Sequence, residues 1–206
     1  MARLDFWFDF ASSYSYLAAV RIGPLAEAAG VAVRWRPFLL GPVFASLGFK
    51  GPPVESQQLK GRYMWRDLER LGEKHGVPFT RPALFPPRSL LAARAALALR
   101  ASGGPDAAFG AEVFRAAYGR GEDIGDEELI ANLLQRAGAD AGATLAAARS
   151  DAVKAELRAE TERAQAIGLF GAPSFVTADN ELFWGHDRME DALDWARRAP
   201  PARDAA

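Results

Sequence analysis

The chain has 206 residues, and its 25 lysines and arginines nearly balance 26 aspartates and glutamates, for a formal net charge of −1. This balance gives no electrostatic reason to expect nucleic acid or an anionic membrane as a partner. The sequence contains no cysteine, which excludes disulfides, thiolate metal ligands and thiol catalysis by the protein itself. Its two histidines disfavour a multi-histidine metal centre, so we expect no metal site.

Half of the residues are hydrophobic and a quarter are charged, as in an ordinary globular protein. No apolar run reaches the length that spans a bilayer. Strand-like alternation begins directly after Arg3, so we expect no signal peptide and a cytoplasmic location.

The N-terminal stretch predicts a strand followed by a sharp turn into a helix. Leu4, Phe6, Phe8 and Phe10 alternate with more polar residues, which indicates one apolar face. The alternation stops at residues 11–13, and a helix is expected from there to Gly30, with Ser12 or Ser13 as its cap. A serine hydroxyl and free backbone N–H groups at such a turn suit an anion, such as a thiolate or phosphate. The alternative is that Ser12 only caps the helix.

The following segments change from strand to helix. Residues 31–36 alternate and end at Pro37, so a parallel βαβ unit is expected. Residues 41–54 are rich in glycine and proline and predict a loop. Every periodic segment from 56 to 168 then predicts helix.

Strand patterns return only near the C-terminus. Residues 174–177 and 181–184 predict a hairpin, and the helix after them should bury Met189, Ala192, Leu193 and Trp195. The order β-α-β, helices, β-β-α is the thioredoxin arrangement with an insertion. The predicted fold is therefore α/β, with a thioredoxin-like domain at 1–40 and 169–206 and a large all-helical insertion at 41–168.

Two loops beside the predicted strands could hold a ligand. At residues 171–173, Gly-Ala-Pro, a cis Ala172–Pro173 bond would present the backbone of Ala172 to an extended peptide, facing the Ser12 turn. At residues 185–188, Gly-His-Asp-Arg, a helix start could bind a carboxylate while Asp187 holds an ammonium group. The alternatives are a simple strand start for the first loop and a helix cap at Asp187 for the second.

A third candidate lies on one helical face. Lys60, Tyr63 and Asp67 have the spacing that places them on the same side of a helix, beside an apolar stripe. A solvated Lys–Asp face is the usual meaning of this pattern.

These motifs together resemble a known family. Residues 9–18 (DFASSYSYLA), Lys60-x-x-Tyr63-x-x-x-Asp67, and the loops at 171–173 and 185–188 occur in this order. The set is similar to the 2-hydroxychromene-2-carboxylate isomerase and kappa-class glutathione transferase family, over nearly the whole chain.

The resemblance implies glutathione as cofactor and Ser12 as the catalytic residue that hydrogen-bonds its sulfur. Ala172 and Pro173 would hold the cysteinyl backbone, and His186 and Asp187, in the same loop as Gly185 and Arg188, would bind the γ-glutamyl end. The implied reaction is isomerisation of a small aromatic substrate of aromatic catabolism, by reversible thiolate addition. The alternatives are a kappa-type glutathione transferase and a non-catalytic thioredoxin-like binding module. Kappa-class proteins also suggest a homodimer.

The sequence departs from the family in two places. Ser13 stands where the family usually has proline, and the loop at 48–55 lacks the asparagine commonly found there. We expect this loop and residues 85–88 to shape the substrate pocket. Lys60, Tyr63 and Arg88 are the expected substrate-binding residues, and further candidates for a substrate carboxylate are Arg34, Arg36 and Lys50.

Overall fold

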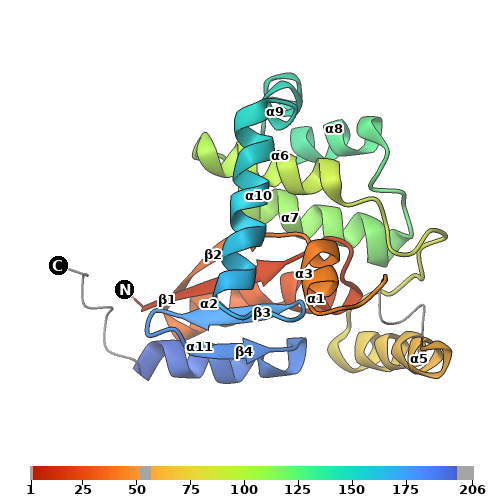
Figure 1. Ribbon diagram of the computed structural model, residues 1–206, viewed down its shortest axis with the longest axis vertical. Coiled ribbons are helices and arrows are strands. Elements are labelled where there is room, and N and C mark those ends of the chain that lie inside the picture. Colours follow the sequence, from red (N-terminus) through yellow and green to blue (C-terminus); the bar gives the residue numbers. More distant parts are fainter. Residues whose placement is uncertain (1, 52–56, 199–206) are drawn as a thin grey trace.

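A four-stranded sheet lies at the centre of the computed structural model, which describes residues 2–51 and 57–198 (Figure 1). The strand order is β2-β1-β3-β4. β1 is parallel to β2 and antiparallel to β3, and β3 and β4 form a hairpin. The predicted parallel pair and C-terminal hairpin are both confirmed. The strands are β1 Ala2–Phe8, β2 Val31–Pro37, β3 Ser174–Thr177 and β4 Leu182–Trp184.

The chain between β2 and β3 is helical, and further helices lie between β1 and β2 and after β4. Between β1 and β2 lie α1 Ser13–Ala19 and α2 Ile22–Ala29, and the first helix after β2 is α3 Leu40–Ser46. The intervening helices are α5 Gln58–His75, α6 Leu90–Ala101, α7 Asp106–Phe114, the π-helix η1 Arg115–Arg120, α8 Glu127–Arg136, α9 Ala141–Ala148 and α10 Asp151–Ala166. A 3₁₀ turn η2 His186–Arg188 leads into α11 Met189–Arg198. The fold is thus thioredoxin-like with a helical insertion, and the boundaries at 41 and 168 stay a prediction.

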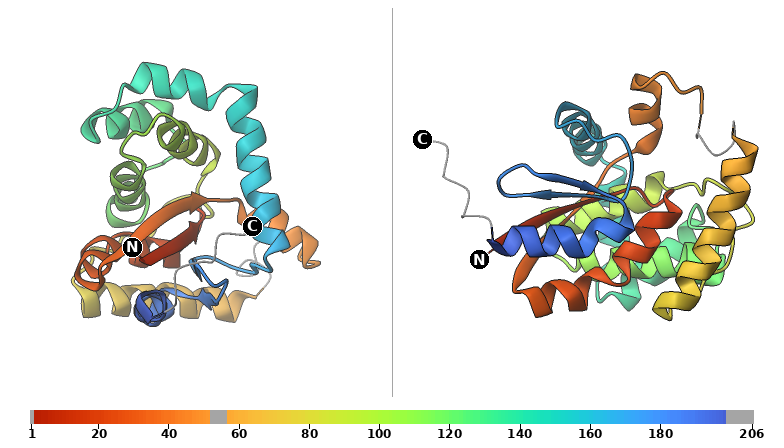
Figure 2. Two further views of the ribbon diagram at one scale, coloured as in Figure 1. Left: turned by 90° about the vertical axis from the view of Figure 1, so that its left-hand side faces the viewer. Right: turned by 90° about the horizontal axis from the view of Figure 1, so that it is seen from below.

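Both faces of the sheet are covered, as the two further views in Figure 2 show. Leu4, Phe6 and Phe8 of β1 belong to the main core, which includes residues of α1, α6, α7 and α11. Trp7 lies on the opposite face, where it packs with Phe38 in a second cluster that α3 and α10 cover. The predicted apolar face of β1 is therefore confirmed, while α3 and α10 also cover the opposite face at Trp7.

Two local predictions are wrong. Residues 40–46 form α3 instead of a loop, since Pro42 lies in the first turn, where a helix needs no backbone donor. Trp195 is 46% exposed instead of buried, and its indole Nε1 donates to Asp179 Oδ2 at 3.0 Å.

The first helix is divided and the last inserted helix is anchored to the sheet. The helix expected up to Gly30 is two helices, α1 and α2, separated at Val20 and Arg21. Glu160 of α10 accepts two hydrogen bonds from Arg36 of β2, at 2.7 and 2.9 Å. Both side chains are buried, so this pair fixes the insertion against the sheet. Over the described residues, no helix is long and apolar enough to cross a membrane.

Candidate active site

Ser12 lies at the end of the turn that joins β1 to α1. Its extended backbone makes it the N-cap of α1, and its hydroxyl accepts the Ser15 N–H at 3.2 Å. The same hydroxyl donates to the carbonyl oxygen of Ala172 at 2.9 Å. The predicted meeting of the two loops is therefore confirmed, and the capping role of Ser12 coexists with this contact.

The Ala172–Pro173 peptide bond is cis, the isomer that the sequence analysis expects. Packing explains why residue 171, just before this peptide bond, is glycine. A Cβ atom on Gly171 would lie 2.4 Å from Trp184 Nε1. The loop can therefore lie directly against the indole at the end of β4. This contact brings Ala172 and Trp184 to the same place.

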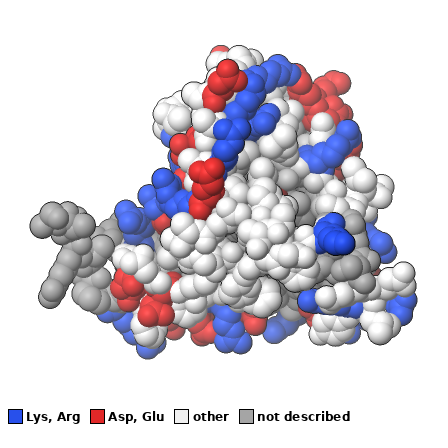
Figure 3. All heavy atoms as spheres, in the orientation of Figure 1, with Lys and Arg blue, Asp and Glu red and all other residues white. Residues whose placement is uncertain are grey.

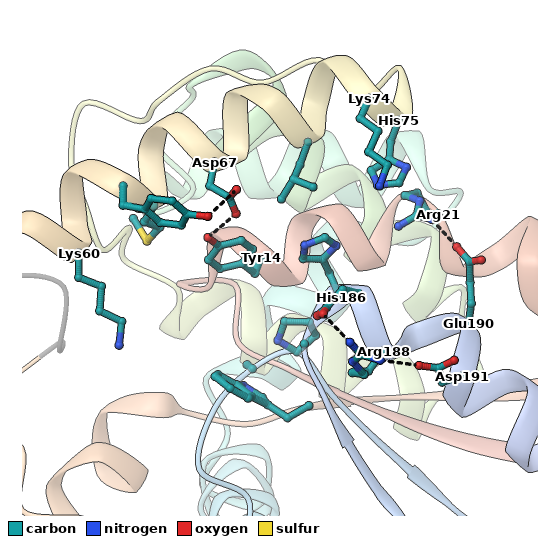
Figure 4. Close-up of a pocket in the computed structure, with 18 residues that line it drawn as sticks. Tyr14, Arg21, Lys60, Asp67, Lys74, His75, His186, Arg188, Glu190 and Asp191 are labelled. Atoms are coloured by element: carbon teal, nitrogen blue, oxygen red, sulfur yellow. Dashed lines mark hydrogen bonds and ion pairs between the residues drawn. The ribbon is translucent and has the colours of Figure 1, made fainter.

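A polar cavity of about 830 Å³ opens between α5, α1 and the turn at residues 185–188 (Figure 4). Charged side chains of both signs surround it. Its lining includes Tyr14, Arg21, Lys60, Tyr63, Asp67, Lys74, His75, Ala172, Pro173, Gly185, His186, Asp187, Arg188 and Glu190.

Tyr14 connects two walls of the polar cavity. Its hydroxyl donates to Asp67 Oδ2 at 2.9 Å, and its ring stacks on His186 at 5.6 Å with the planes 2° apart. Burial, and then the hydrogen bond to Asp67, raise the pKa of Tyr14, so its hydroxyl stays protonated at neutral pH. Tyr63 also donates to Asp67, at 3.4 Å.

His186 and Asp187 lie in the cavity wall in different environments. Nδ1 of His186 is buried without a hydrogen-bond partner, and burial lowers the pKa of this histidine. Asp187 is exposed and pairs with Arg188 at 3.4 Å. Among the described residues, no side-chain hydrogen bond caps this turn, so the alternative that Asp187 caps α11 is not supported. Gly185 has a φ of 110°, and a Cβ atom there would lie 2.4 Å from the Asp187 carboxylate. A side chain at position 185 would therefore displace Asp187.

A second, apolar cavity of about 460 Å³ adjoins the first. Ser12, Phe44, Phe49, Phe85 and Phe170 are among the residues around it. The uncharged centre of the face in Figure 3 contrasts with the charged side chains that follow α10. Both cavities share the residues Tyr14, Lys60, Met64, Ala172 and Trp184.

Most predicted site residues line one of these cavities, but Arg88 does not. Its exposed side chain pairs with Asp123, so the prediction that it binds substrate finds no support in the geometry. Arg34 pairs with Asp5, and Arg36 is buried against Glu160, so neither is available to a substrate. Lys50 is exposed and lines neither cavity.

The loops expected to shape the substrate pocket contribute Phe49, Gly51, Phe85 and Pro86 to the apolar cavity. Residues 52–56 of the first loop lie outside the described residues. Sequence reasoning missed Phe44, Phe170 and Trp184, which come from three segments that only the fold brings together. Sequence reasoning also missed the role of Tyr14, for which the available signal was its position two residues after Ser12, in the first turn of α1.

The comparisons with known proteins agree with this geometry. A family model described as DSBA-like thioredoxin domain matches residues 3–194. The 2-hydroxychromene-2-carboxylate isomerase of Sphingobium xenophagum is 35% identical over 188 residues, which cover 91% of this chain and 94% of that protein. This chain belongs to the 2-hydroxychromene-2-carboxylate isomerase and kappa-class glutathione transferase family.

Two further members of the 2-hydroxychromene-2-carboxylate isomerase and kappa-class family extend the comparison. A solved structure of a 2-hydroxychromene-2-carboxylate isomerase superimposes with a TM-score of 0.84 at 28% identity, covering 95% of each chain. Glutathione S-transferase kappa 1 of Rattus norvegicus is 25% identical over 219 residues, or 98% of this chain and 96% of that one. The likeness therefore includes the helical insertion as well as the sheet.

Proposed function

We propose that this chain is a glutathione-dependent isomerase of the 2-hydroxychromene-2-carboxylate type, acting on a small aromatic substrate of aromatic catabolism. The observation that carries the proposal is the position of Ser12. Its hydroxyl reaches Ala172 O at 2.9 Å, where a polar and an apolar cavity adjoin. A polar thiol and an aromatic substrate can therefore meet at one serine.

The residues of the polar cavity fit glutathione. Asp187 suits the ammonium group of the γ-glutamyl end, and the orphaned Nδ1 of His186 can accept a hydrogen bond from the same end. Arg188 suits a carboxylate of the ligand. The chain has no cysteine of its own, so sulfur chemistry at this site requires a ligand.

Bound glutathione would supply a thiolate that adds reversibly to the unsaturated substrate, so that a bond can rotate before the thiolate leaves. Ser12 would turn its hydroxyl proton from Ala172 O to the sulfur and lower the pKa of the thiol. Ala172 would then offer its backbone to the cysteinyl residue. Phe44, Phe85 and Phe170 would enclose the aromatic part and exclude water.

Lys60 is our candidate for the substrate carboxylate, because it lines both cavities. Tyr63 lines the polar cavity together with Lys60 and would contact the substrate at the same end. The cytoplasmic location and the homodimer stay predictions.

The second candidate function is glutathione transfer onto an electrophile at the same site, favoured by the likeness to the rat kappa-class protein. The two reactions differ in the fate of the thiol. Isomerisation returns glutathione, whereas transfer consumes one thiol for each product.

The test combines calorimetric titration of the chain with glutathione and an assay of a 2-hydroxychromene-2-carboxylate. We expect saturable binding and conversion at constant free thiol. Thiol loss in step with product would favour transfer. Binding without turnover of this substrate or of a reactive aryl halide would favour the non-catalytic module, and no binding would contradict every glutathione-dependent function.

A further inference from the structure

Two buried polar side chains hydrogen-bond to the Ser12 turn and have no role in the proposed chemistry, although Asp9 also lines the apolar cavity. The Tyr118 hydroxyl is fully buried and donates to the carbonyl oxygen of Phe10 at 3.2 Å. The Asp9 carboxylate accepts the N–H of Ala11 at 2.9 Å and that of Leu40 at 2.8 Å. Together they bind the two residues that directly precede Ser12.

Tyr118 is placed by the π-helix η1 that follows α7. The N–H of Gly121 donates to Ala116 O, which is the wide hydrogen-bond pattern of a π turn, and residues 116–118 are all buried. Thr80 ties this turn to the loop after α5, because its N–H donates to Tyr118 O at 2.6 Å and its hydroxyl to Gly119 O at 2.9 Å. Isolated π turns inside helices frequently occur at functional sites.

We propose that Tyr118 and Asp9 are positioning residues for Ser12, which hold its turn at the distance and angle that the cofactor sulfur requires. The inference rests on the proposed function. Tyr118 fixes the peptide carbonyl before Ala11, and Asp9 fixes the peptide N–H after Phe10. Asp9 also ties the turn to the first residue of α3, which carries a wall of the apolar cavity.

The physical reason is the steep dependence of this chemistry on position. Misplacing a reacting group by about 1 Å can cost roughly 100-fold in rate. Burial and the nearby Asp9 charge raise the pKa of Tyr118, so its hydroxyl is always a donor. The carbonyl oxygen of Phe10 is buried, and the hydrogen bond from the Tyr118 hydroxyl supplies the partner that a buried carbonyl requires.

Tyr118→Phe is the test, with Tyr16→Phe as the matched control. Both tyrosines are buried, and their rings stack at 5.9 Å. The Tyr16 hydroxyl, however, donates to Pro78 O at 2.5 Å, away from the Ser12 turn. Each variant loses one hydroxyl and one hydrogen bond to a backbone carbonyl, so their losses of thermal stability should be similar.

The decisive measurement is the pH dependence of the thiolate absorbance of bound glutathione. We expect Tyr118→Phe to raise the pKa of the bound thiol and to lower kcat by roughly tenfold with KM little changed. Tyr16→Phe should leave both unchanged. Equal thiol pKa values in the two variants would overturn the role of Tyr118.

Asp9→Asn tests the role of Asp9 by the direction in which it shifts the pKa of the bound thiol. Burial raises the pKa of the Asp9 carboxyl, while the hydrogen bonds from Ala11, Leu40 and Ser89 oppose this shift. Loss of whatever negative charge Asp9 carries would by itself lower the thiol pKa, whereas loss of the hydrogen bond to Ala11 raises it. We expect a rise, and a fall would overturn the positioning role of Asp9. If the unmodified chain binds no glutathione, the proposed function fails. If it binds and ionises the thiol but Tyr118→Phe behaves like Tyr16→Phe, only this inference fails.

Discussion

Adjacent serines at the start of α1 have different surroundings. The Ser12 hydroxyl faces Ala172 O, while the Ser13 hydroxyl contacts Met64 Sδ of α5 at 3.8 Å. The backbone turns by about 100° per residue at a helix start, so neighbouring side chains point to different walls. Both serines line the apolar cavity, but Ser12 is the one that contacts the cis-proline loop.

Ser12→Ala should therefore abolish most of the activity while glutathione still binds. Removal of one preorganised donor to a developing or resting anion costs about 100-fold or more in kcat. The pKa of the bound thiol should rise toward that of a free thiol, roughly 8.5 for an unperturbed cysteine. Ser13→Ala should change neither quantity. An intact thiolate in Ser12→Ala and a lost one in Ser13→Ala would show that Ser13 is the catalytic residue.

His186 should make stability dependent on pH. Burial lowers its folded-state pKa below the ordinary value of 6.5, with opposing effects from Asp187 and Asp67 and supporting ones from Arg21 and His75. The unfolded chain therefore takes up the proton first as the pH falls below 6.5, and folded stability declines there. His186→Gln should flatten the change in unfolding free energy between pH 7 and pH 5, measured by urea denaturation.

The partly buried His75 provides the comparison, because its pKa is also lowered. His75→Gln should flatten the same curve less, because burial withdraws less of the imidazole of His75 from water than of His186. An unchanged pH dependence in His186→Gln would contradict the buried, neutral state of this histidine.

At the scale of elements, one ion pair ties α10 to the sheet. Glu160 is 1% exposed and faces Arg36, whose guanidinium lies over the Trp7 ring at 4.3 Å. Glu160 also pairs with Arg100 and Arg163, and Arg36 keeps a longer contact to Asp5 at 3.3 Å. Removing Glu160 takes away the shorter ion pair of the buried Arg36, and breaking a buried pair is costly. Glu160→Ala should thus destabilise the fold by about 3 kcal/mol.

Glu156 is the matched control on the same helix. It pairs with Arg100 at 3.1 Å but is about half exposed, so Glu156→Ala should cost at most about 1 kcal/mol. Urea denaturation of both variants checks the difference. Equal losses would mean that α10 is held by its apolar contacts alone.

Local patterns predicted the strands, most helix ends and the order of elements. Gly30, Gly76 and Gly121 end helices with positive φ, as their positions in the sequence indicate. The π turn was not predicted, because its extra residue is stabilised by contacts with Thr80, which lies far away in the sequence. The prediction that Trp195 is buried was wrong because periodicity shows which side chains share a face of a helix, but not how much of that face other elements cover.

The candidate site was predicted only in part, because local motifs identify residues close in sequence but not those that the fold brings together. Motifs with short spacing, such as the loops at 171–173 and 185–188, carried their own signal. The loops at 48–55 and 85–88 were expected at the substrate pocket and do line the apolar cavity, but Phe44, Phe170 and Trp184 come from separate segments without such a signal. The charge of Arg88 predicts a substrate contact, but its pairing with Asp123 depends on the tertiary fold, which the local sequence does not show.

For the whole molecule, the adjoining cavities predict a separation of two binding functions. Phe170 lines the apolar cavity and is 44% exposed, so Phe170→Ala should raise KM for the aromatic substrate by roughly tenfold. The dissociation constant of glutathione should stay the same. Trp195→Ala is the control, since this tryptophan is 46% exposed and lines neither cavity. Equal effects of the two variants on KM would contradict the assignment of the apolar cavity to the substrate.

The crystal structure of the chain with glutathione tests the central claim most directly. We expect the cysteinyl sulfur within hydrogen-bond distance of Ser12 Oγ, the cysteinyl backbone paired with Ala172, and the γ-glutamyl end beside His186 and Asp187. The Ser12 hydroxyl should no longer donate to Ala172 O. Glutathione bound with its sulfur away from Ser12, or in contact with Ser13 instead, would contradict the account.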